Sequence, residues 1–291
     1  LALHDEPDLS LQLGEAYLDF EGVSRLWNQE RTLNLRLGRM DIPFGEEYME
    51  HDAIDDPLIS HSLVDLWGVD VGIEAYGTIG PVSYVASVQN GGYNTTDFTT
   101  DKAVTLRLSA DPKPWLHVSA SAMRTGNNSS DDEVSATWFG GGWFVPYGGA
   151  TRFHAELVEG DARIVIPHGY VQMFGGYIRY DNNGPAGPTG RDIYYYSAEA
   201  VRNIFHKVYG AARFSQIFAA HGFPIVGNGT MREYLFAPTT DEIWRLSLGL
   251  GYRLNHNLTI KGEYTFEHGR EINGGHRDHE DLVGVEAAYK F

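Results

Sequence analysis

The sequence predicts an all-β protein, a transmembrane antiparallel up-and-down β-barrel of about 14–16 strands. Apolar and polar residues alternate with a period of two over segments of about ten residues, the length of a tilted strand that spans a membrane. Short turns alternate with long polar stretches, as in barrels whose turns lie on one side of a membrane and whose loops lie on the other. The sequence contains no run of 18 or more apolar residues, which excludes a transmembrane helix.

The clearest unit is a hairpin over residues 244–268. The apolar residues of its first strand share one parity, and the alternation resumes after the short link 255–257. Successive side chains of a strand point to opposite faces, so each strand has one apolar and one polar face. We expect the apolar face to meet lipid and the polar face to enclose a wet cavity. The outward positions are Trp244, Leu246, Leu248, Leu250, Tyr252, Leu254, Leu258, Ile260, Tyr264 and Phe266.

The same alternation predicts the other strands of a single barrel domain over residues 1–291. We expect a turn at Glu159–Gly160–Asp161, and a bulge or break at Pro167, because proline donates no ladder hydrogen bond. The expected strands are 9–21, 31–41, 66–77, 81–90, 102–110, 115–124, 150–158, 162–179, 193–202, 207–216, 242–254, 257–268 and 281–291.

This count is odd, whereas a closed antiparallel bacterial barrel has an even number of strands. The first and last expected strands run in the same direction, so they cannot pair with each other as antiparallel neighbours. We therefore expect that one or three strands before Leu1 are missing from this chain, or that the region 125–180 contains a strand more or less than expected.

Composition excludes several classes of function. The net charge of −17 argues against nucleic acid as a partner. The absence of cysteine removes thiol catalysis, Cys-ligated zinc and covalently attached c-type haem. No nucleophile or nucleotide-binding motif is present, so we expect no enzyme activity, no cofactor and no metal. His51 with Asp52 and Asp55, and the residues around His276 and His279, are interpreted as polar loops rather than zinc sites.

The C-terminal strand alternates through Val283, Val285 and Tyr289 and ends on Phe291. This pattern resembles the C-terminal insertion signature of bacterial outer-membrane β-barrels. The resemblance implies a location in the outer membrane of a Gram-negative bacterium, with outer-membrane lipid and lipopolysaccharide around the barrel.

A second resemblance concerns residues 14–44. They contain Glu15-Ala16-Tyr17, then Leu-Asn-Leu-Arg-Leu-Gly-Arg at 33–39 and Pro43-Phe44 followed by Gly45. This stretch, together with 67–92 and 244–265, resembles the phosphate-selective porin family. The resemblance implies a 16-stranded, often homotrimeric, passive diffusion channel for small hydrophilic or charged solutes. Lysine and arginine number 22 against 39 acidic residues, so we carry over the architecture and not phosphate as the solute.

Two charged sets are the candidate site residues of such a channel. If segment 42–65 folds into the lumen, a basic wall faces an acidic constriction, which would orient polar solutes and slightly favour cations. The basic set, on the inward parity of the strands, is Arg36, Arg107, Arg152, Arg163, Arg213, Arg245, Arg253 and Lys261. The acidic set, in the constriction-loop candidate, is Glu46, Glu47, Glu50, Asp52, Asp55 and Asp56.

Three alternatives remain open at this level. The acidic segment could lie in solvent, with the arginines paired to Asp70, Glu74, Glu156, Glu199 and Glu263 on neighbouring strands. The barrel could be a sheath around a periplasmic or lumen-filling partner such as a multihaem cytochrome, forming an electron conduit across the outer membrane. The chain could also be a secreted glycan-binding β-sandwich, whose strands would pack one face on a second sheet.

Overall fold

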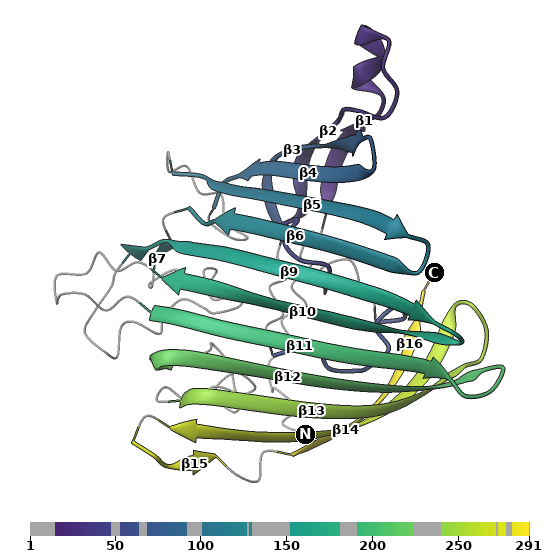
Figure 1. Cartoon of the computed structure of the whole chain (residues 1–291), viewed down its shortest axis with the longest axis vertical. Coiled ribbons are helices and arrows are strands. Elements are labelled where there is room, and N and C mark those ends of the chain that lie inside the picture. Colours follow the sequence, from purple (N-terminus) through teal and green to yellow (C-terminus); the bar gives the residue numbers. More distant parts are fainter. Residues whose placement is uncertain are drawn as a thin grey trace, which may run out of the picture.

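The computed structural model describes one large antiparallel sheet (Figure 1). The described residues are 15–47, 53–63, 69–91, 101–126, 128–129, 152–180, 191–223, 240–271, 273–277 and 281–290. Among them, no helix is long and apolar enough to cross a membrane. The elements are β1 (Ala16–Phe20), η1 (Val23–Trp27), β2 (Asn34–Asp41), β3 (Val69–Ile79), β4 (Val82–Gln89), β5 (Ala103–Lys113), β6 (Leu116–Arg124), β7 (Asn128–Ser129), β8 (Arg152–Phe153), β9 (Ala155–Ile166), β10 (Gly169–Tyr180), β11 (Arg191–Asn203), β12 (Val208–Phe223), β13 (Thr240–Arg253), β14 (Leu258–Glu271), β15 (His276–Arg277) and β16 (Leu282–Tyr289).

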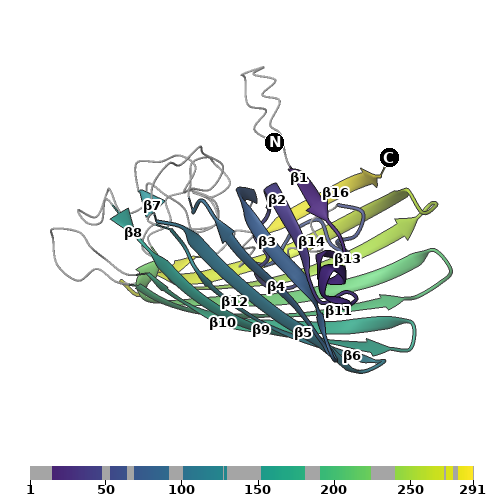
Figure 2. The ribbon, with the colours of Figure 1, turned by 90° about the horizontal axis from the view of Figure 1, so that it is seen from above.

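The up-and-down topology predicted from the sequence is confirmed. The main sheet has 14 strands in the order β1-β2-β3-β4-β5-β6-β9-β10-β11-β12-β13-β14-β15, and β16 also pairs with β14. All of these pairings are antiparallel. Among the described residues, consecutive strands are neighbours with two exceptions: the short β7 and β8 pair with each other outside the main sheet, and β15 and β16 both pair with β14. Figure 2 shows that the strands curve into a trough.

The expected division between the two faces of the strands is also confirmed. On β13, Leu248 and Leu250 are 44% and 61% exposed, whereas Arg245 and Ser247 are 7% and 1% exposed. The exposed apolar residues face away from the trough, and the polar residues face into it. This arrangement is the reverse of a water-soluble domain and matches a barrel wall surrounded by lipid. No second sheet covers the outward face of β13 among the described residues, which contradicts the sandwich alternative.

The hairpin predicted at residues 159–161 was wrong. Glu159, Gly160 and Asp161 lie in the middle of β9, which pairs continuously with both β6 and β10. The chain instead reverses at Pro167–His168, between the paired residues Ile166 and Gly169. Proline is well suited to a turn because it needs no ladder partner there, and His168 adopts a positive φ of 66°. The predicted break at Pro167 is therefore this turn, and the strands 150–158 and 162–179 become β9 and β10.

The sheet of the described residues is not closed. β1 forms one edge, and β16, with the short β15, forms the other beside β14. The alternating pairings make β1 and β16 run in the same direction, as the sequence predicts. An antiparallel pairing between these two edges would need their directions to be opposite.

Candidate functional site

The segment between β2 and β3 lies against the inward face of the sheet. Its described parts are residues 42–47 and 53–63, and Figure 1 shows the dark-blue chain behind the strands. Four of its large apolar side chains are buried: Ile42 is 4% exposed, Phe44 2%, Leu58 1% and Leu63 5%. Ile42, Phe44 and Leu63 belong to a hydrophobic cluster with inward side chains of seven strands. The strands contribute Ala103, Met123, Ala155, Leu157, Phe174, Ile178, Ile193, Tyr195, Ile217, Ala219 and Ile243 to this cluster.

The first polar anchor of the segment contacts β5, β6 and β9. The Gly45 amide donates to Ser121 Oγ at 3.0 Å, and the Glu46 amide donates to Asp161 Oδ1 at 3.3 Å. The Glu46 carboxylate pairs with Arg107 and lies 3.0 Å from His117 Nε2. Residues 45–46 are therefore bound through both their backbone and a side-chain charge.

The second polar anchor contacts β13 and β14. The amides of Ile59 and Ser60 both donate to Glu263 Oε2, at 2.5 and 3.0 Å. Ser60 Oγ also donates to Glu263 and lies 3.1 Å from Ser247 Oγ. Lys261 Nζ donates to the carbonyl of Leu58 at 2.8 Å. A buried carboxylate that accepts several hydrogen bonds fixes the path of the backbone that donates them.

Arg213 on β12 connects this second anchor to the wall. Its guanidinium lies 2.6 Å from Glu199 Oε2 on β11 and 3.1 Å from Asp56 Oδ1 in the segment. It also donates to the carbonyl of Ser60. The side chains of Arg213, Asp56 and Glu199 are 7%, 4% and 5% exposed, so this group of charges is screened from water.

The two described parts of the segment also contact each other. Glu47 accepts from the Ser62 amide at 2.8 Å and from its hydroxyl at 2.6 Å. A gap of about 10 Å³ remains between Glu47 and the wall, beside Gln172 and Arg213. This volume is close to the space that one water molecule needs. The segment thus lies directly on the β10–β12 part of the wall.

The two acidic anchors differ in their electrostatics. Burial alone would raise the pKa of Glu46, but the hydrogen bond and positive charge of Arg107 outweigh it and hold this pKa below its usual value. Burial raises the pKa of Asp56 above its usual value, and the charge of Arg213 compensates only in part.

The remaining basic candidates lie at different depths. The Arg36 side chain is 26% exposed and pairs with Asp19 at 3.2 Å and Glu74 at 3.0 Å. Arg245 is buried against Glu267 at 2.6 Å. Lys261 also pairs with Glu286 at 3.0 Å. The guanidinium groups of Arg163 and Arg253 lie over the rings of Tyr170 and Tyr209, and Arg152 lies in β8 with its side chain outside the described part.

The other predicted residues are placed as follows. Asp55 is exposed and lies 3.2 Å from Lys290 Nζ, whereas Glu50, Asp52 and Phe291 are outside the described residues. Val283, Val285 and Tyr289 on β16 are 79%, 82% and 57% exposed. No group of three or more His, Cys, Asp or Glu residues in the described part is arranged to hold a metal ion.

Sequence reasoning missed two components of this site. Glu263 was considered only as a partner for arginines, and Ser60 was not singled out, although together they hold the segment. The inward apolar residues Ile178, Ile193 and Ile243 were also missed, because the expected inner face was polar. The sequence does contain a signal for two of them. Ile193 and Ile243 alternate in step with the polar inward residues of their own strands, which indicates the inner face.

Comparison with known proteins supports the fold at low sequence identity. No family model and no curated protein sequence matches the chain. Solved structures similar to it include OmpT of Vibrio cholerae (TM-score 0.58, 11% identity, 89% of this chain and 77% of that chain). They also include the outer membrane channel DcaP of Acinetobacter baumannii (0.58, 12%, 90% and 72%). A third is the anion-selective porin of Comamonas acidovorans (0.56, 9%, 89% and 74%). The chain therefore has the fold of the porin β-barrels.

Proposed function

We propose that this chain is a porin of a Gram-negative outer membrane, through which small hydrophilic or charged solutes diffuse passively. The main support is the inward segment, held to one side of the wall by Glu46 at Arg107 and by Ser60 at Glu263. A segment fixed inside the barrel narrows the lumen without closing it, and the width and charge of what remains decide which solutes pass. Lipid and lipopolysaccharide would surround the exposed apolar outer face.

The solute path would run along β1–β4, opposite the wall that carries the segment. Arg36 supports this, because its side chain is 26% exposed whereas those of Arg213 and Arg245 are 7% and 8% exposed. A solute can meet Arg36 and its partners, but it cannot reach the buried arginines. With a net charge of −17, the channel would favour cations weakly.

Single-channel recording in a planar bilayer under a KCl gradient tests this proposal. The purified chain should give defined conductance steps and a reversal potential that indicates a weak cation preference. Arg36→Gln should increase that preference, because it leaves Asp19 and Glu74 without their cation. Arg124→Gln is the matched control, since Arg124 faces outward on β6 and its side chain is 53% exposed. Absence of conductance steps would refute the proposal.

The proposal extends to the oligomeric state, the family relationship and a partner in the lumen. A homotrimer and a relationship to the phosphate-selective porins both agree with the fold, and neither is needed for diffusion through one barrel. A lumen-filling cytochrome is less well supported, because the chain's own segment already occupies the inner face of β9 and β12–β14.

A further inference from the structure

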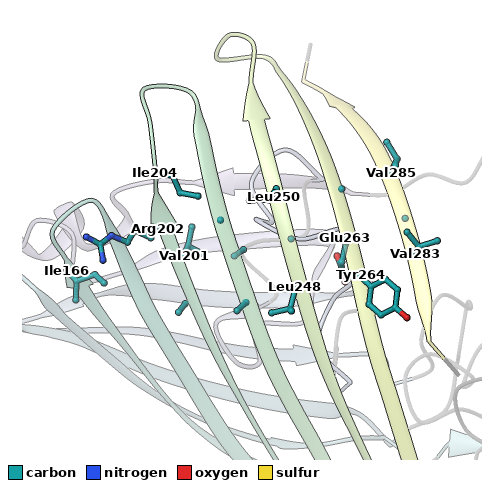
Figure 3. A pocket seen from close by; sticks show the side chains of 17 residues that line it. Ile166, Val201, Arg202, Ile204, Leu248, Leu250, Glu263, Tyr264, Val283 and Val285 are labelled. Atoms are coloured by element: carbon teal, nitrogen blue, oxygen red, sulfur yellow. The ribbon is translucent and has the colours of Figure 1, made fainter. Parts of the chain in front are cut away.

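The outward face of β11–β14 and β16, with Ile166 at the end of β9, carries an apolar hollow near the short turns (Figure 3). Its volume is about 880 Å³, within the range of small-molecule sites. The floor consists of small residues: Ala200 and Ala212 are neighbours across β11 and β12, and Gly210 and Gly262 lie on either side of Leu250. At Gly262, a methyl group would meet no other heavy atom within 4 Å. Taller side chains lie around and between these small residues, namely Ile166, Ile204, Leu248, Leu250, Tyr264, Val283 and Val285.

Arg202 stands at the edge of the hollow on the lipid-facing side of β11. Its neighbours across the strands are Gly169 and Gly210, so no side chain covers its guanidinium from either strand. Figure 3 shows Arg202 between Ile166 and Ile204. Within the described part of the chain, Arg202 is exposed and has no hydrogen bond or ion pair. An unpaired cation beside apolar surface in a membrane needs an anionic partner or water.

The adjoining turns are basic although the chain as a whole is acidic. Residues 166–169, 202–208, 252–258 and 288–290 contain no aspartate or glutamate. The same segments carry Arg202, Lys207, Arg253 and Lys290, of which Lys290 is paired with Asp55 at 3.2 Å. Exposed apolar residues accompany these charges, since Ile204 is 51% and Phe205 73% exposed. Cationic and apolar groups side by side match the boundary between lipid headgroups and acyl chains.

We propose that the hollow binds one anionic phospholipid of the surrounding leaflet. One of its acyl chains lies on the Ala–Gly floor, and its phosphate pairs with Arg202. This inference rests on the proposed membrane location and adds a specific lipid site to it. Charge complementarity selects a phospholipid over a second copy of the chain, because the basic turns would repel the same turns of another copy.

Lipid retention by the purified full chain tests the site. Delipidated protein in detergent is titrated with phosphatidylglycerol, with diacylglycerol of the same chains as the probe that lacks phosphate, and bound lipid is counted by native mass spectrometry. Arg202→Gln should weaken phosphatidylglycerol binding about tenfold, as expected for losing a charge-assisted hydrogen bond. It should leave diacylglycerol binding unchanged. Gly262→Leu, which fills the floor, should weaken the binding of both probes.

The controls separate this inference from the proposed function. Arg124→Gln removes another outward arginine and should bind phosphatidylglycerol like the wild type. Equal binding by wild type and Arg202→Gln would overturn the site, even if both variants conduct ions normally. Lost conductance with intact, Arg202-dependent lipid binding would overturn the porin proposal alone. If the substitutions change the oligomeric state in light scattering but not lipid binding, the hollow is a contact between copies and the inference is wrong.

Discussion

The guanidinium of Arg213 lies 3.1 Å from the Asp56 carboxylate, although 157 positions separate the two residues. Asp56 belongs to the inward segment, and Arg213 to the middle of the wall. Because Glu199 approaches the same guanidinium from β11, one cation pairs with two buried carboxylates. Removing the cation leaves both negative charges buried, which costs more free energy than the pairs contribute when intact.

The first prediction is that Arg213→Gln destabilises the protein by about 3–5 kcal/mol, the usual effect of breaking a buried ion pair. Adding Asp56→Asn and Glu199→Gln should restore part of that loss, since no unpaired charge then remains. Thermal unfolding in detergent, followed by circular dichroism, measures both. Arg253→Gln is the control, because Arg253 is exposed at a turn and donates to Asn203 at 3.1 Å. If Arg213→Gln and Arg253→Gln lowered the stability equally, the buried charges around Arg213 would not have the role described.

The second prediction uses the absence of cysteine from the chain. Ser60 Oγ and Ser247 Oγ are 3.1 Å apart, so cysteines at both positions should form a disulfide on mild oxidation. Electrophoresis with and without reductant detects the bond, and conductance should be unchanged because the segment already occupies this position. Ser60→Cys with Ser119→Cys is the mismatched pair, since Ser119 contacts Asp161 near the other anchor. Cross-linking of the mismatched pair alone would show that the segment lies elsewhere.

The strands were predictable from sequence where alternation was uninterrupted. In residues 244–268 the alternation predicted which side chains face outward. A shift of the strand by one residue would turn its charged side chains into lipid, so the pattern leaves one orientation. The hairpin between β9 and β10 was misplaced for a local reason. Glu159-Gly160-Asp161 has the composition of a turn, but Glu159 and Asp161 face inward on either side of an outward glycine.

The contacts of the inward segment could not be predicted in the same way. Ser60 and Glu263 are 203 positions apart, and no periodicity relates them. The strand pattern predicts which way Glu263 points, but not which segment of the chain reaches it. The apolar cluster around Phe44 shows the same limit, because Ile178 and Ile243 depart from a polar inner face and are buried in one cluster with Phe44 of the segment.

The third prediction concerns two glycines on neighbouring strands. A methyl group at Gly251 would overlap the ring of Tyr209, which lies across this glycine on the inward face. Gly251→Ala should therefore destabilise the protein by about 1–3 kcal/mol, as overpacking does. Gly262→Ala should be neutral or slightly stabilising, because its side chain would enter open space. Urea or thermal unfolding of both variants measures the difference, and similar stability would contradict the packing described for Tyr209.

The fourth prediction is that the two acidic anchors respond oppositely to acid. The pKa of Glu46 is lowered in the folded state, so its contribution to stability is fully present above the ordinary pKa of about 4.3 and disappears as pH falls through the lower folded value. The stability difference between wild type and Glu46→Gln should therefore shrink on acidification from pH 7 to 3.

The pKa of Asp56 is raised, so the folded state binds a proton more readily than the unfolded chain. As the pH falls from neutral toward the ordinary aspartate pKa, the stability of wild type should therefore rise relative to that of Asp56→Asn. Unfolding temperatures of the three proteins across this pH range give both slopes, and slopes of equal sign would show that Arg107 and Arg213 do not create the two environments described.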